Sequence, residues 1–320
     1  MAGGLIVSES LPAEGSLPAE GSLSAEGSSN TSINKKSHRS LNCGGRWLDL
    51  SSPQVMAVLN ITPDSFSDGG ALHDAGQPDV DKVLRRAEQV IAEGAAILDV
   101  GGESTRPGAQ RVSLQEEMDR VLPVVEALSQ RFDVVVSVDT SAPELMLAAA
   151  ALGVGLLNDV RALEREGALE AAQSTGLPVC LMHMQGQPLF MQDSPQYANI
   201  VEEVIDYLVQ RASRCRSAGI DGDKIILDPG FGFGKTVEHN LALLAQLPSL
   251  MEAGYPVLVG LSRKSIIGKV LGREVDQRLA GSLSLATLAV TGGATIIRAH
   301  DIKETVDAVT MAHAVMKQTL

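Results

Sequence analysis

Cysteine, basic charge and long apolar runs are all scarce in this 320-residue sequence. Its three cysteines, Cys43, Cys180 and Cys215, are widely spaced and odd in number, which argues against a disulfide framework and predicts reduced thiols in the cytoplasm. The net charge of −13 argues against nucleic acid or an anionic membrane as the main partner. No run approaches the roughly 18 apolar residues of a membrane span, and no export signal is recognisable at the N-terminus. These absences leave an enzyme-sized globular protein, whose 44% hydrophobic content suits a large core.

The first forty residues have a composition unlike the rest. The near-repeat SLPAEG, SLPAEG, SLSAEG runs from Ser10 to Gly27 and is followed by a Ser/Asn-rich stretch. Because this segment has no aromatic and few branched residues, it cannot bury enough surface to offset the entropy of ordering it. The sequence predicts a disordered tail over 1–42 and a single folded domain over 43–320, with a short strand or hairpin at 46–50.

From Val55 onward, short apolar runs alternate with longer amphipathic segments. Eight runs have the length and composition of strands in a buried parallel sheet, and they cover residues 55–60, 96–101, 134–139, 156–159, 179–184, 225–228, 257–262 and 295–300. Helical patterns lie between them, among others at 80–94, 114–130, 200–219 and 278–293. This alternation predicts an α/β fold of the (β/α)8 TIM barrel type. An open doubly wound sheet shares the alternation, but eight such units favour closure.

Nearly every predicted strand ends in a polar residue. In (β/α)8 barrels, ligands bind at the carboxyl ends of the strands, so side chains at these positions converge on one rim. A barrel with only a structural role would need far fewer of them. The residues at these strand ends are Asn60, Asp99, Asp139, Asn158, Asp159, His183, Asp228, Ser262, Arg263, Lys264, Arg298 and His300.

The stretch from Ile225 to Lys235, IILDPGFGFGK, shows how such a strand opens into a binding loop. The apolar run stops at Asp228, and Pro229 cannot continue the hydrogen-bonded ladder. Alternate glycines then allow the backbone to fold closely over a ligand, with Phe231 and Phe233 as apolar walls. We therefore expect this loop to form part of a binding site.

Two patterns resemble known motifs without matching them. GFGFGKT (230–236) is similar to a Walker loop, but Pro229 stands at the first required glycine and the alternate glycines do not fit GxGxxG, which argues against a P-loop ATPase. His183 has no HxxxH or HExxH companion, so it is predicted to be a pocket or core histidine rather than a metal ligand.

The loops after the first two predicted strands have the composition of mobile lids. LNITPDSFSDGG (59–70) and GGESTRPGA (101–109) are rich in Gly, Pro, Ser, Thr and Asp, and we expect them to close over the barrel mouth and exclude water. Thr105 and Arg106 offer donors to an anion, while Asn60 suits a phosphate or a water on its metal ion.

Carboxylates and cations are predicted to line opposite walls of the mouth. Asp139 and Asp228 suit the planar NH-bearing edge of a guanidine-like heterocycle, and Asn158 can both donate to and accept from the same ring. The basic wall consists of SRKS (262–265) and RAH (298–300), whose Arg and His share a face because residues two apart in a strand point the same way. This arrangement predicts a ligand with an NH-rich head and a phosphate tail. A glycosidase acid–base pair or a metal site would leave the basic wall unexplained.

Eight motifs in this order resemble those of the bacterial dihydropteroate synthases of the pterin-binding family. The resemblance extends from about Val55 to the end of the chain and is carried by LNITPDSFSDGG, DVGGESTRPGA, SVDT, LLNDVRAL, CLMHMQG, LDPGFGFGKT, LSRKSIIG and IIRAHDIKET. It implies a transferase of folate biosynthesis that condenses 6-hydroxymethyl-7,8-dihydropterin pyrophosphate with p-aminobenzoate, giving 7,8-dihydropteroate and pyrophosphate. It also implies Mg²⁺ as cofactor, sulfonamides as inhibitors and a cytoplasmic homodimer.

The resemblance further implies a role for each site residue. The pterin ring is expected at Asp139, Asn158, Met182, Asp228, Lys264 and Arg298. Pyrophosphate and Mg²⁺ are expected at Asn60, Thr105, Arg106, Arg298 and His300, with Asn60 on the metal; these residues and Lys264 would carry the catalysis. The p-aminobenzoate slot is expected to consist of Phe66, Thr105, Pro107, Phe233 and Ser265.

Three alternatives share parts of this pattern. A pterin-binding barrel that transfers a methyl group from methyltetrahydrofolate to a corrinoid protein would not need the STRPGA loop or the basic wall. A non-catalytic pterin- or sulfonamide-binding protein is expected to lose loop residues such as Asn60 or Arg106, yet both are present. A diverged enzyme that confers sulfonamide resistance is the third, but the GFGFGKT loop has no insertion beside the slot.

Overall fold

The computed structural model describes residues 40–62, 73–74, 77–104, 112–186, 191 and 195–318. Eight strands form one parallel sheet in the order β10-β9-β8-β7-β6-β3-β12-β11. A parallel bridge between Leu227 and Val257 joins the two ends of this order, and the amide of Leu227 donates to the Pro256 carbonyl at 2.9 Å. The strands are β3 (Gln54–Asn60), β6 (Ile97–Gly101), β7 (Val135–Asp139), β8 (Leu156–Asp159), β9 (Val179–Met182), β10 (Ile225–Asp228), β11 (Leu258–Val259) and β12 (Ile296–Ala299).

Each strand neighbours the strand that precedes or follows it in the barrel series, and the sheet closes on itself. An open doubly wound sheet would instead reverse its strand order at a switch point. The predicted (β/α)8 barrel is therefore confirmed, and all eight predicted runs contain its strands.

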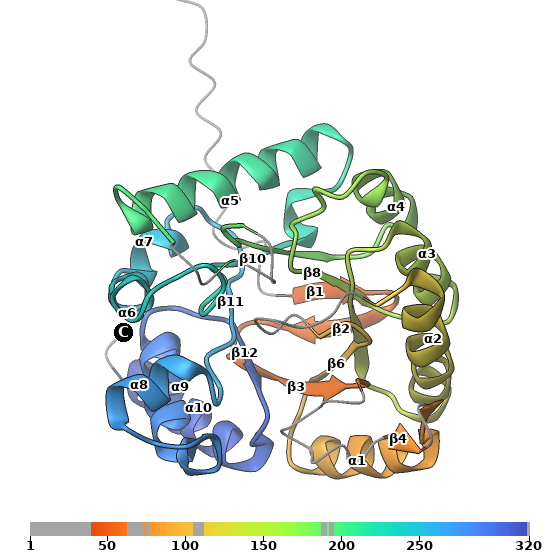
Figure 1. Ribbon diagram of the computed structural model, residues 1–320, viewed down its shortest axis with the longest axis horizontal. Coiled ribbons are helices and arrows are strands. Elements are labelled where there is room, and N and C mark those ends of the chain that lie inside the picture. The colour runs from red at the N-terminus through yellow and green to blue at the C-terminus, as the bar shows by residue number, and fades with distance from the viewer. Residues whose placement is uncertain are drawn as a thin grey trace, which may run out of the picture. The chain divides into compact units, whose positions relative to one another are not determined.

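Helices lie around the outside of the sheet (Figure 1). Capping explains several of their starts: the Asp79 side chain accepts from the Lys82 amide at the head of α1, and Ser113 and Glu116 form a reciprocal capping box on α2. The helices are α1 (Val80–Ala92), α2 (Leu114–Arg131), α3 (Pro143–Ala151), α4 (Ala168–Thr175), α5 (Ile200–Ser217), α6 (Val237–Ala245), α7 (Leu247–Met251), α8 (Ser265–Leu271), α9 (Leu279–Thr291) and α10 (Ile302–Met316). Short 3-10 turns occur at Gly222–Lys224 and Val275–Gln277, and a two-stranded ladder joins β4 (His73–Asp74) to β5 (Gln77–Pro78).

An antiparallel hairpin, β1 (Ser40–Cys43) and β2 (Arg46–Asp49), packs against the amino-terminal end of the barrel. Its buried Leu41, Cys43 and Leu48, together with Leu50, share an apolar cluster with one inward-facing residue from each barrel strand. Those eight residues are Met56, Ile97, Val135, Leu156, Cys180, Ile226, Leu258 and Ile296. With this end filled, a ligand has to approach from the carboxyl ends of the strands.

The hairpin corrects the predicted domain boundary. Residues 40–42 were assigned to the tail, but they belong to β1, because Leu41 alternates with exposed neighbours and contributes to the apolar cluster. The predicted strand at 46–50 is confirmed as β2. The rest of the predicted tail lies outside the described residues.

All three cysteines, Cys43, Cys180 and Cys215, are buried, and no disulfide joins them. In the described ranges, no helix combines the length and apolarity that a membrane crossing requires.

Candidate active site

The alternation of side chains along each strand carries polar groups into the barrel interior. Side chains two residues apart in a strand lie on the same face. The residues two positions after the inward-facing apolar residues therefore also point into the barrel, and five of them are polar: Asp99, Ser137, Asn158, Asp228 and Arg298. Four positions after the inward-facing apolar residues, the same face holds Asn60, Asp139 and His300. The strands that close one end of the barrel with hydrocarbon thus present polar groups at the other.

Asp99 and Arg298 form the centre of this polar layer. The Arg298 guanidinium donates from Nε to Asp99 Oδ2 at 2.7 Å and from Nη2 to Asp139 Oδ2 at 3.1 Å. Asp99 is 0% exposed, and it also accepts from Ser137 Oγ at 2.7 Å and from Asn158 Nδ2 at 3.2 Å. One arginine therefore links two carboxylates from neighbouring strands, and an asparagine from a third strand joins the network.

Burial and charge shift the pKa values of these groups. Burial raises the pKa of Asp139 to about 8, and the charge of Asp99 adds to the rise while Arg298 opposes it. Burial also raises the pKa of Asp228, against the opposing charge of Lys264. Burial lowers the pKa of Lys264 to about 8, which Asp228 counteracts. The site thus holds paired charges in a poorly solvated space, where they interact more strongly than in water.

The glycine loop, residues 230–234, follows Asp228 at the end of β10. Asp228 Oδ1 accepts from the Gly230 amide at 2.7 Å, and the Lys264 ammonium donates to the Phe231 carbonyl. Gly230 has φ +66°, and a β-carbon there would overlap the carbonyl oxygen of His183. Phe231 is fully buried, whereas the ring of Phe233 lies beside Lys264, with Nζ 4.7 Å from the ring centre. Only glycine fits at the first position of this loop. Its closure over a ligand stays a prediction.

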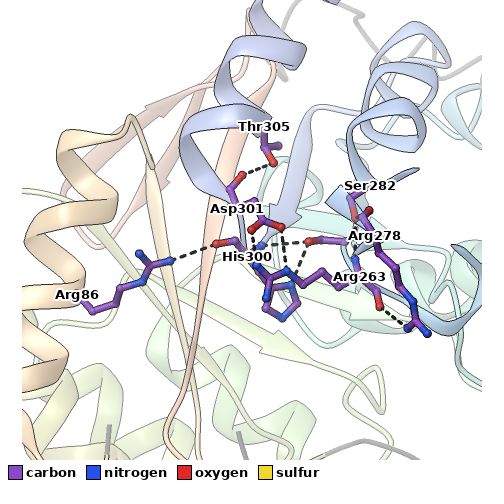
Figure 2. A network of polar contacts seen from close by, with 8 residues as sticks. Arg86, Arg263, Arg278, Ser282, His300, Asp301 and Thr305 are labelled. Atoms are coloured by element: carbon purple, nitrogen blue, oxygen red, sulfur yellow. Dashed lines mark hydrogen bonds and ion pairs between the residues drawn. The ribbon is translucent and has the colours of Figure 1, made fainter. Parts of the chain in front are cut away.

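Two members of the basic wall, Arg263 and His300, lie in the loops after β11 and β12 (Figure 2). The hydroxyl of Ser262 accepts from the His300 amide at 3.2 Å and lies 3.1 Å from His300 Nδ1. Arg263 has φ 58°, and its guanidinium forms a two-point ion pair with Asp301. The carbonyl of Arg263 accepts from Arg278 Nη1 at 3.0 Å. These contacts tie the two basic loops to each other.

Several predicted site residues lie close together, and others cannot be placed. Arg298 bonds to both Asp139 and Asp99, and Asp99 also accepts from Asn158. Met182 is the register partner of Asp228 in the neighbouring strand. Lys264 immediately precedes α8, whose first residue is the exposed Ser265. Four predicted residues lie outside the described ranges: Phe66, Thr105, Arg106 and Pro107.

Three polar residues of the site were missed as functional candidates. Asp99 was noted only as a strand end, although its position two residues after an inward-facing apolar residue could have indicated an interior carboxylate. Ser137 has the same spacing in β7. Lys235 stands in the predicted binding loop but receives no role of its own from the sequence, yet it is only 3% exposed. No local pattern signals that burial.

Comparisons with known proteins agree with this geometry. Residues 56–300 match the family described as pterin binding enzyme. Dihydropteroate synthase of Escherichia coli (strain K12) is 53% identical over 272 residues, which cover 85% of this chain and 95% of that protein. The Haemophilus influenzae dihydropteroate synthase is 51% identical, with 83% and 95% covered.

Solved structures give the same result. The Yersinia pestis dihydropteroate synthase in a sulfonamide drug complex superposes with a TM-score of 0.83 at 51% identity, covering 87% of this chain and 99% of that one. The Xanthomonas albilineans dihydropteroate synthase with 4-aminobenzoic acid has a TM-score of 0.80 at 48% identity, with 87% and 98% covered. The chain therefore belongs to the pterin-binding enzyme family, within its dihydropteroate synthases.

Proposed function

We propose that this chain condenses 6-hydroxymethyl-7,8-dihydropterin pyrophosphate with p-aminobenzoate through the residues of the polar layer. The observation that carries the proposal is the network in which Arg298 bridges Asp99 and Asp139, with Asn158 bonded to the same carboxylate. It combines acceptors for an NH-rich ring with a fixed cation at the carboxyl ends of the strands. A substrate with an NH-rich ring and a phosphate tail needs hydrogen-bond acceptors and a cation in the same site.

The pterin ring is assigned to the carboxylate side. Asp228 uses Oδ1 to accept from Gly230, so its second oxygen is available to an NH donor of the ring. Asn158 and Asp139 supply further polar groups from neighbouring strands. Met182 is buried next to Asp228 and provides an adaptable apolar contact to the ring face.

The chemistry requires a stabilised leaving group. The C–O bond to pyrophosphate breaks, the electron pair leaves with pyrophosphate, and the ring-stabilised cation is captured by the neutral aryl amine, which then loses a proton. Arg298, His300 and Lys264 supply positive charge and hydrogen-bond donors toward the departing anion. Thr105 and Arg106, in the loop after β6, are proposed to donate further hydrogen bonds to the pyrophosphate.

Mg²⁺ is proposed to bind beside Asn60. A β-carbon at Gly101 would lie 3.9 Å from Asn60 Oδ1 and 3.8 Å from Asp139 Oδ2, so both oxygens lie close to this end of β6. In the described part of the chain, no three His, Cys, Asp or Glu side chains gather as a metal cluster. Magnesium that takes most of its ligands from phosphate and water needs only one or two protein oxygens, and these residues fit that need. When bound, it would neutralise charge on the pyrophosphate.

The second substrate is assigned to a slot beside the glycine loop. Phe233 offers one apolar wall, and Ser265 offers a hydroxyl to the p-aminobenzoate carboxylate; Phe66, Thr105 and Pro107 are proposed to complete the slot. The sulfonamide and 4-aminobenzoic acid complexes of the related enzymes support the proposal that this chain binds p-aminobenzoate and is inhibited by sulfonamides.

A homodimer in the cytoplasm is proposed as the working state. Helices α8, α9 and α10 are neighbours, and they expose the apolar side chains of Val270, Leu271, Leu288, Met311 and Val315. Such an exposed apolar group favours association. Sedimentation velocity of the full chain would test it, because a monomer at micromolar concentration would refute the dimer.

The function is tested by pyrophosphate release that depends on p-aminobenzoate, together with Asp228→Asn. The amide keeps the shape but removes the charged acceptor, so pterin binding should weaken by about 2 kcal/mol or more, while pyrophosphate binding should hardly change. Asp221→Asn, an exposed control, should leave both affinities unchanged. Equal losses for both ligands in calorimetry would place Asp228 outside the ring pocket.

A further inference from the structure

Lys235 is buried, with only 3% of its surface exposed. Within the described ranges it nevertheless forms no ion pair with a carboxylate. Its ammonium instead faces four acceptors: the carbonyls of Gly230 at 2.9 Å, Phe233 at 3.1 Å and His183 at 3.3 Å, and His183 Nδ1 at 2.9 Å. Burying an ammonium group is costly unless it is fully hydrogen-bonded. A lysine so placed calls for a role beyond packing.

The acceptors show what Lys235 holds. Gly230 and Phe233 lie near opposite ends of the glycine loop, and one ammonium bonded to both fixes the distance between them. Other groups secure the rest of the loop: Asn240 Oδ1 accepts from the Gly232 amide at 2.7 Å, and the Tyr197 hydroxyl donates to the Gly234 carbonyl at 2.8 Å. Side chains of Lys235, Asn240 and Tyr197 thus hold the backbone of the loop at several points.

His183 is the partner that links Lys235 to the neighbouring strand. Because Nδ1 accepts from the ammonium, the ring proton belongs on Nε2. Burial and the charge of Lys235 lower the pKa of His183 to about 3, so the ring remains a neutral acceptor at physiological pH. The imidazole also packs edge-on against Tyr207, with ring centres 5.0 Å apart, and the tilted ring of Tyr197 lies 6.1 Å away.

We propose that Lys235 is a positioning residue, which fixes the glycine loop through His183 so that Phe233 forms a preformed wall for the aromatic amine. The inference rests on the proposed function, because that function assigns Phe233 to the second-substrate slot. The ring of Phe233 also lies beside the Lys264 ammonium. A displaced loop would move the aromatic wall, whereas the network of Asp99, Asp139, Asn158 and Arg298 lies on other strands and should be retained.

The test compares Lys235→Met with Lys224→Met, the same change in a partly exposed surface pair. Steady-state kinetics of full-length protein should show the KM for p-aminobenzoate raised at least about fivefold in Lys235→Met, with the KM for dihydropterin pyrophosphate changed less than about twofold. Hydrogen exchange of the 229–236 peptide should accelerate in the same variant. Lys224→Met should match the wild type in both measurements.

Two variants of His183 provide a second route. His183→Asn retains an acceptor for the ammonium and should keep the KM for p-aminobenzoate near the wild-type value, whereas His183→Leu should reproduce the effect of Lys235→Met. If Lys235→Met does not fold, these two His183 variants still test whether Lys235 positions the glycine loop. A merely structural role would lower stability in all variants without separating the two KM values.

The outcomes separate the positioning role from the proposed function. A folded Lys235→Met with an unchanged KM for p-aminobenzoate and unchanged exchange would overturn the positioning role. A proportional rise in both KM values would also overturn it. Wild-type protein that releases no pyrophosphate with p-aminobenzoate would instead refute the proposed function, and hydrogen exchange would still test the hold of Lys235 on the loop.

Discussion

Replacing Asp99 by asparagine removes the charge from the centre of the site without changing its volume. The carboxylate accepts from Arg298 Nε at 2.7 Å, from Asn158 Nδ2 at 3.2 Å and from Ser137 Oγ at 2.7 Å. An amide oxygen can still accept from Arg298, and its nitrogen can donate to Ser137. The variant therefore measures what the buried charge contributes.

The expected loss of unfolding free energy depends on the partners that Arg298 retains in the variant. Removing one partner of a buried ion pair costs about 3 to 5 kcal/mol. Arg298 retains Asp139 at 3.1 Å, so we expect the low end of this range, about 3 kcal/mol in the free energy of unfolding. The pKa of Asp139 should also fall from about 8, because the charge of Asp99 contributes to its rise.

The assay is urea denaturation at pH 7, with Asp133→Asn as the matched control. Asp133 pairs with Arg46 at 3.0 Å but its side chain is 97% exposed, so its loss should cost less than about 1 kcal/mol. A loss below about 1 kcal/mol for Asp99→Asn, or equal losses in the two variants, would refute the view that the buried charge organises the site.

Four further predictions concern other parts of the chain. Gly230→Ala should cost at least about 3 kcal/mol in urea denaturation, because the new β-carbon overlaps a carbonyl, whereas Gly272→Ala, with similar φ and open space, should cost about 1 to 2 kcal/mol. His183 binds a proton in the unfolded chain below about pH 6.5 but in the folded chain only near pH 3, so this group alone should contribute a stability loss of about 2 kcal/mol between pH 7 and pH 5. Because the raised pKa of Asp139 acts in the opposite direction, the loss is measured as the difference in pH dependence between the wild type and His183→Asn. Deleting residues 1–39 should change stability by less than about 1 kcal/mol and leave turnover unchanged; a larger loss would show that the segment packs. Sulfonamide should bind at least about fivefold more tightly with pyrophosphate and Mg²⁺ present, and Arg106→Ala should abolish this enhancement in calorimetry without weakening pterin binding; tight binding to the free protein would argue against loop closure.

Sequence alone determined the barrel and the location of its polar rim. Parallel strands buried on both faces have to be continuous apolar runs, so β3 and β10 can be recognised from local composition. The polar residue at the end of each run marks the carboxyl edge, which predicted Asp228 and Arg298 at one rim. The roles assigned to them remain predictions from family resemblance.

Tertiary structure alone decided which of these groups meet. Asp99 and Arg298 are 199 residues apart and become partners only when the sheet closes, because closure brings β6 and β12 to either side of β3. Lys235 looks like an ordinary polar loop residue until folding surrounds its ammonium with carbonyls from two loops. Leu41 gains its place in the core only from a barrel end built by eight distant strands. Local sequence records the preference of each residue for strand, helix or turn, whereas burial and charge pairing are properties of the assembled chain.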